Sequence, residues 1–118
     1  MLARNIVVVF VCVMIAGTVA AESEMGHIRP KSVAATCSVN SAQISWEEVH
    51  SANLTGYDVY EKSPGNPDFI KVNQNLIAET FYIVTDLASS TQYHFAVTAV
   101  YSDGIASDLS DPAGCVTG

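Results

Sequence analysis

Basic residues are scarce in this chain. It has 5 Lys and Arg against 12 Asp and Glu, for a formal net charge of −7. A surface that binds nucleic acid carries a patch of Lys and Arg that neutralises phosphates, and anionic membrane surfaces attract the same residues. The acidic residues are scattered along the chain, which is typical of a solvated surface. The charge balance therefore argues against nucleic acid and against anionic membrane as partners.

Helix signals, internal repeats and low-complexity segments are also missing. After residue 21, no stretch shows apolar residues at the three- and four-residue spacing of an amphipathic helix. This absence excludes helical bundles and folds in which strands alternate with helices. With 118 residues in all, the chain has room for one small domain and is too short for two.

Long apolar runs are absent except at the N-terminus, where residues 6–16 are apolar without interruption. Arg4 precedes this run, and the small residues 17–21 follow it. This order is typical of a secretory signal peptide, which we expect over residues 1–21. A retained membrane anchor is the alternative, but the apolar stretch is shorter than the roughly 20 residues that a spanning helix needs. We therefore expect a secreted or periplasmic protein that leaves the membrane after cleavage.

The remaining sequence consists mainly of short stretches in which apolar and polar residues alternate, the pattern of strands with one buried face. Turn-forming residues separate the stretches, most densely over residues 63–67. Short strands at intervals of about ten residues are typical of a β-sandwich. The expected strands are Val33–Ser38, Ala42–Glu48, Tyr57–Glu61, Phe69–Asn73, Thr80–Val84, Tyr93–Tyr101 and Ser107–Cys115.

The signal peptide and the expected strands divide the chain into four parts, of which residues 1–21 are the first. Residues 22–31 are polar, with a glycine and a proline, and are expected to form a flexible arm. Residues 32–115 form the sandwich, and residues 116–118 a C-terminal tail.

The most specific pattern runs from Leu87 to Ser107, where Leu87 stands six residues before Tyr93 and Gly104 follows the predicted strand. The order and spacing of these residues and a few others resemble the fibronectin type III domain over nearly all of the chain after the leader. The residues that carry the resemblance are Pro30, Trp46, Gly56, Tyr57, Val59, Tyr60, Leu87, Tyr93, Val97, Ala99, Gly104, Ser107 and Ser110.

The resemblance implies an all-β, immunoglobulin-like sandwich of seven strands, preceded by the signal peptide. It implies a tyrosine corner in which the ring of Tyr93 packs on the core and its hydroxyl bonds to backbone near Leu87. Trp46, Tyr57 and Val97 complete the expected structural core. The amino-acid sequence looks most like modules of secreted bacterial proteins, which often accompany polysaccharide-degrading enzymes. We therefore expect a bacterial source.

Two cysteines follow the leader, Cys37 and Cys115. An exported chain meets an oxidising compartment, so an even pair favours a disulfide. The resemblance places the ends of the first and last strands at the same pole of the sandwich, which would let these two residues pair. Two free thiols or an intermolecular bridge are the alternatives.

Candidate surface sites are few. On the sheet that contains the strand 93–101, a candidate binding face is formed by Tyr60, His94, Val100 and Tyr101. Phe81 and Ile83 are expected to face outward on the other sheet. The expected loop residue Asn53 lies in the sequon Asn53-Leu-Thr55, a candidate N-glycosylation site if the chain passes through a eukaryotic secretory pathway.

The sequence supplies no catalytic constellation, cofactor motif or metal site. The adjacent Glu47 and Glu48 would point to opposite faces of a strand and could not share a substrate. His27, His50 and His94 lack the spacing of metal ligands. The aspartates at positions 103, 108 and 111 lack the dense alternation of a calcium loop.

We therefore expect an exported, non-catalytic module for protein–protein interaction or adhesion, with a protein or cell-surface partner. The alternative is a carbohydrate-associated accessory module of an extracellular polysaccharide-degrading system. Such a module needs an aromatic platform, for which Tyr60, Phe69 and Tyr101 are the candidates.

Overall fold

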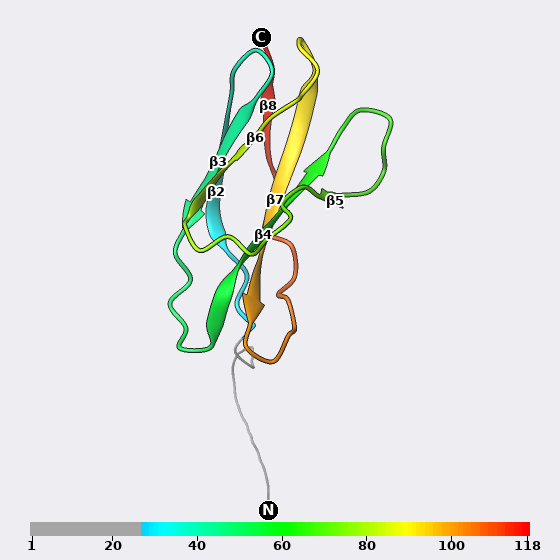
Figure 1. The fold of residues 1–118 in the computed structure, drawn as a ribbon. Helices are drawn as coiled ribbons and strands as arrows, with labels where there is room; N and C mark the ends of the chain where they lie inside the picture. Colours follow the sequence, from blue (N-terminus) through cyan, green and yellow to red (C-terminus); the bar gives the residue numbers. More distant parts are fainter. Residues whose placement is uncertain (1–26) are drawn as a thin grey trace, which may run out of the picture.

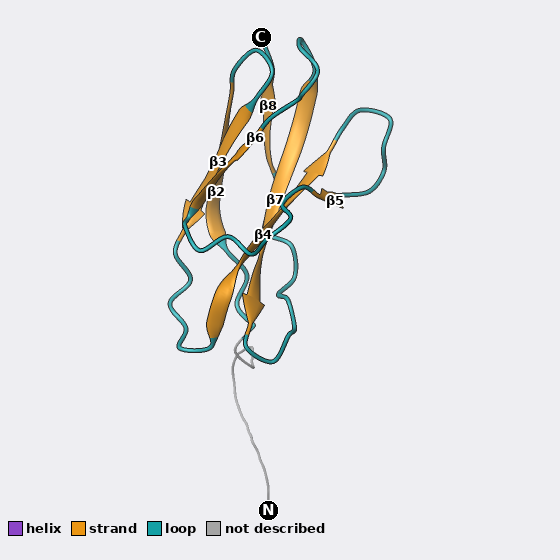
Figure 2. Ribbon diagram, viewed as in Figure 1, coloured by secondary structure: helices purple, strands orange, loops and turns teal. Residues whose placement is uncertain are grey.

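The computed structural model describes residues 27–118, which form two antiparallel sheets (Figures 1 and 2). The expected signal peptide and residues 22–26 of the expected arm lie outside the described residues. One sheet has three strands in the order β2-β3-β6, and the other has four in the order β5-β4-β7-β8. The strands are β2 (Lys31–Cys37), β3 (Ala42–Glu47), β4 (Leu54–Lys62), β5 (Ile70–Lys71), β6 (Phe81–Val84), β7 (Gln92–Tyr101) and β8 (Ala113–Val116).

Alternation along the strands produces the core between the sheets. In β3, Ala42, Ile44 and Trp46 are buried, and the residues between them are more exposed. Because successive side chains of a strand point to opposite faces, this segment turns its apolar half toward the other sheet. There the ring of Trp46 meets Tyr57 of β4 edge-on, with 5.3 Å between ring centroids. The sheets are thus joined by aromatic packing near the middle of the sandwich.

The corner before β7 is held by Tyr93. Its hydroxyl accepts a hydrogen bond from the backbone N–H of Ala88 at 2.9 Å, next to the buried Leu87. The expected tyrosine corner is therefore present. Tyr57 and Val97 are buried as well, so all five residues expected to form the structural core lie in it.

A disulfide joins Cys37 of β2 to Cys115 of β8, with the two Cα atoms 5.7 Å apart. It links the two sheets across a sequence separation of 78 residues, and its position agrees with the expected pairing. The residues after it are also fixed, since Val116 still belongs to β8 and the side chain of Thr117 is buried. The Thr117 hydroxyl donates to the carbonyl of Ala88. The expected tail 116–118 is thus part of the packed domain.

The last strand begins later than the sequence suggested, at Ala113 rather than Ser107. Before Ala113, serine hydroxyls replace backbone carbonyls as hydrogen-bond acceptors for β7. Ser107 Oγ accepts from the N–H of Ala99, and Ser110 Oγ accepts from the N–H of Val97. Side-chain bonds of this kind compete with strand pairing, and Pro112 has no N–H to donate.

The expected strand Phe69–Asn73 is also shorter in the structure, where only Ile70–Lys71 form β5. The side-chain oxygen of Asn73 accepts a hydrogen bond from the N–H of Val59 at 2.8 Å. This bond takes the position of a further backbone rung, so the strand ends before residue 73.

Candidate functional site

The candidate face of the four-stranded sheet is only partly accessible. Tyr60 lies opposite Ala96 in the register, and His94 lies opposite Lys62. Tyr60, His94 and Val100 are half-buried, while Ala96, between them, is 1 % exposed. The structure thus places these three residues on one face, but each presents only part of its side chain.

Tyr101 does not belong to that face. It is 3 % exposed and points into the core, as Tyr93 does, because the two residues are an even number of positions apart on one strand. Its hydroxyl donates to the carbonyl of Ile28 at 2.6 Å. Burial is the main cause that raises the pKa of this hydroxyl above its usual value. The assignment of Tyr101 to a binding face was therefore wrong.

The segment before β2 packs against the same end of β7. His27 meets the ring of Tyr101 edge-on at 5.0 Å, and its Nε2 lies 2.8 Å from Oδ2 of Asp103. A guanidinium N–H of Arg29 donates to the carbonyl of Leu109 at 3.3 Å. Residues 27–30 of the expected arm thus contact the domain, and β2 already includes Lys31.

Two large, exposed apolar side chains lie on β6. Phe81 is 47 % exposed and Ile83 is 52 % exposed, on the outer face of the three-stranded sheet. Their register partners on β3 are Ser45 and Gln43, which carry no charge. Phe81 and Ile83 therefore form a small apolar surface beside uncharged neighbours, as their outward positions in the sequence predicted.

β6 is also an edge strand, because within the described residues it pairs only with β3. The N–H of Trp46 donates to the carbonyl of Thr80 at 3.0 Å, so Thr80 turns its backbone groups toward β3. In an antiparallel pair the bonded residues alternate along the strand. The backbone N–H and C=O groups of Phe81 and Ile83 consequently point to the free side of β6.

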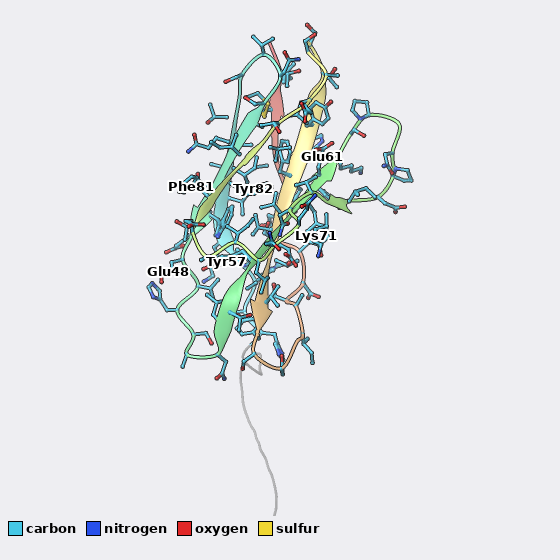
Figure 3. The ribbon with its side chains drawn as sticks, viewed as in Figure 1. Glu48, Tyr57, Glu61, Lys71, Phe81 and Tyr82 are labelled. Atoms are coloured by element: carbon cyan, nitrogen blue, oxygen red, sulfur yellow. A yellow bond between two sulfur atoms is a disulfide. The ribbon has the colours of Figure 1, made fainter. Side chains whose placement is uncertain are left out.

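That free side borders a groove of about 690 Å³ between β6 and the segment that follows β5. Three carboxylates line it, those of Glu61, Glu79 and Asp86, and its lining contains no Lys, Arg or His. Figure 3 shows Tyr82 of β6 between Phe81 on the outer side and Glu61 of β4. The groove therefore combines an open strand edge with negative charge.

Glu61 occupies an inward position of β4, in step with the buried Tyr57 and Val59. Burial raises the pKa of its carboxyl above the ordinary value. Between residues 27 and 118, no Lys, Arg or His side chain lies within ion-pair distance of Glu61, so this carboxylate has no cationic partner there. Sequence reasoning missed this residue, although its period-two position relative to Tyr57 and Val59 already indicated that it faces inward.

The remaining candidates stay apart from one another. Asn53 is exposed in the turn that leads into β4, and the hydroxyl of Thr55 donates to the carbonyl of Val100. In the described part of the chain, no group of three or more His, Cys, Asp or Glu side chains is placed to hold a metal ion. The same part contains no helix long and apolar enough to cross a membrane.

Two facing antiparallel sheets, a tyrosine corner and strand order β5-β4-β7-β8 define an immunoglobulin-like β-sandwich. The model of the fibronectin type III domain matches residues 29–115. The chain belongs to this family.

Solved structures agree with the family assignment. Domains A168–A170 of titin are 27% identical and match with a TM-score of 0.67 over 76% of this chain and 32% of the titin fragment, so the chain spans about a third of that fragment. A Fn3-like protein from Clostridium thermocellum is 23% identical, with a TM-score of 0.62 over 79% of this chain and 95% of its own. A beta-1,2-glucanase from Parabacteroides distasonis is 16% identical, with a TM-score of 0.60 over 75% of this chain and 13% of the enzyme. The last two similarities show the fold alone.

Proposed function

We propose that this chain is an exported, non-catalytic module that binds another protein through β6. The observation that carries the proposal is the exposure of Phe81 and Ile83 on a strand whose other edge pairs with no described strand. Exposed apolar side chains that lie together mark interaction surfaces, and an open edge supplies backbone groups to a partner. Export is supported by the Cys37–Cys115 disulfide and by the leader pattern in the sequence.

The face around Tyr60, His94 and Val100 is the weaker candidate, because it is half-buried. A carbohydrate-binding role is also less well supported. Such a role needs a flat, accessible aromatic platform, and Tyr101 is buried. Phe69 is partly covered as well, since the Lys62 ammonium lies 5.9 Å from its ring centroid.

The proposal is tested by retention of extracellular proteins from the source organism on the immobilised domain. We expect the immobilised wild type to retain one protein that the immobilised double variant Phe81→Ser, Ile83→Thr does not retain. The matched control is Ile105→Thr, which changes a side chain of similar exposure in the turn after β7. All three proteins should melt alike, because surface substitutions usually change stability by no more than about 0.5 kcal/mol.

Calorimetry with the purified partner then measures the loss of affinity directly. Equal binding by the double variant would contradict the proposal. So would retention of the domain on insoluble polysaccharide without any protein partner, since that result favours the carbohydrate role.

A further inference from the structure

We propose that the groove beside β6 binds an extended, positively charged segment of a partner protein, which adds to β6 as a new strand. This inference rests on the proposed function, and it adds the chemical class of the partner segment and the way in which it binds.

The backbone of β6 supplies the first part of the argument. The N–H and C=O groups of Phe81 and Ile83 point away from β3, and Ile83 lines the groove. A strand that pairs with another lies about 4.8 Å from it and satisfies such groups by main-chain hydrogen bonds. This mode of recognition gives affinity through the backbone and specificity through alternate side chains. It requires an extended peptide.

The charges of the groove supply the second part. Glu79 and Asp86 lie just before and just after β6, and Glu61 lines the opposite wall. None of the basic residues Arg29, Lys31, Lys62 and Lys71 lines the groove.

A desolvated carboxylate without a cationic partner is unfavourable, and burial raises the pKa of Glu61. An incoming guanidinium or ammonium group would relieve this cost through a charge-assisted hydrogen bond. The groove therefore favours a peptide with Arg or Lys at alternate positions, so that these side chains point toward the carboxylates.

A second copy of this chain fits less well. Antiparallel pairing of two β6 strands would bring the end that carries Glu79 in one copy beside the end that carries Asp86 in the other. The carboxylates gathered at both ends of the pair would repel one another. The charge pattern thus selects against self-pairing and for a basic partner.

The test uses an acetylated, amidated heptapeptide in which arginine alternates with valine. We expect calorimetry to show that the folded domain binds this peptide and does not bind a matched peptide with glutamate in place of arginine. Methylation of the peptide nitrogens that would pair with β6 should abolish binding, because it removes the main-chain donors. This arm needs no variant of the protein and so does not depend on the folding of a mutant.

Glu61→Gln should weaken binding of the arginine peptide by about fivefold, the effect of losing one partly exposed ion pair worth about 1 kcal/mol. The matched control is Glu48→Gln, which neutralises an exposed carboxylate outside the groove lining and should bind as the wild type does. Equal affinities for the two variants would overturn the inference.

Undiminished binding of the N-methylated peptide would also overturn it, since charge alone would then account for the affinity. A dimer of the domain in sedimentation that the peptide dissociates would assign the edge to a second copy instead. The arginine peptide could fail to bind while the wild type still binds a protein partner that the Phe81 and Ile83 double variant does not bind. In that case this inference fails and the proposed function stands. Absence of any protein partner would remove the proposed function itself.

Discussion

The hydroxyl of Tyr101 donates a hydrogen bond to the carbonyl of Ile28 at 2.6 Å, across 73 positions of sequence. The neighbouring His27 extends this contact to Asp103 in the turn after β7. The chain that leads into β2 is thereby fixed to the end of β7. One pole of the sandwich is closed by these bonds, and the disulfide links the sheets between β2 and β8.

Tyr101→Phe removes the hydroxyl and keeps the buried ring. We expect a loss of about 0.5–1.5 kcal/mol in the free energy of unfolding, the usual contribution of one hydrogen bond. Amide hydrogen exchange should become faster at Ile28, Arg29 and Lys31, because the segment loses its attachment. The control Tyr60→Phe, on the half-buried outer face, should leave this exchange unchanged, and equal exchange in both variants would contradict the role of the bond.

Tyr93→Phe should reduce the free energy of unfolding more strongly, by about 1–3 kcal/mol, because it leaves the N–H of Ala88 without its partner. Urea denaturation measures this loss. Tyr82→Phe, which changes a half-buried tyrosine on β6, is the control and should have little effect. If the Tyr93 variant unfolded as the wild type does but lost its protein partner, the residue would have a binding role rather than a structural one.

The double variant Cys37→Ala, Cys115→Ala should be less stable by about 2–5 kcal/mol, since the disulfide closes most of the domain and restricts the unfolded chain. The wild type under reducing conditions should show a similar decrease in its urea midpoint. Identical midpoints with and without reductant, or two alkylatable thiols in natively exported protein, would contradict an intramolecular bridge.

Glu61→Gln should stabilise the domain at neutral pH. The pKa of Glu61 is raised above 4.5 in the folded state by burial, so ionisation costs stability at pH values above the folded pKa. As pH falls through that pKa toward 4.5, the folded protein takes up the proton first, and the cost is relieved. The advantage of the glutamine variant should therefore shrink on acidification.

Urea denaturation at neutral and acid pH measures this difference. The Glu48→Gln control should show no comparable pH dependence of its effect. A glutamine variant at position 61 that is less stable than the wild type at neutral pH would mean that the carboxylate has a stabilising partner.

Much of the fold could be predicted because the strand pattern is local. The alternation of Ala42, Ile44 and Trp46 specifies one buried face whatever the neighbouring strand is. The spacing of Leu87 and Tyr93 likewise predicted the corner that the Ala88–Tyr93 bond closes. Cys37 and Cys115 were paired correctly because the first and last strands meet at one pole of this fold.

The errors arose where a side chain replaces backbone or where a strand ends. Ser107 and Ser110 occupy rungs beside β7 with their hydroxyls, so no regular strand begins until Ala113. Tyr101 was assigned to the outer face as a strand-end residue, but it keeps the alternation of β7 and faces inward like Tyr93.

By itself, the sequence determined which side chains face the core, because alternation with a period of two is a property of each strand alone. It also predicted that Phe81 and Ile83 face outward. Only the tertiary structure decided that β6 lies at an edge, because that depends on the order in which strands from distant parts of the chain pair. The same packing brings Glu61 of β4 and Asp86 after β6 to one groove, so the negative site beside the free edge exists only in the folded chain.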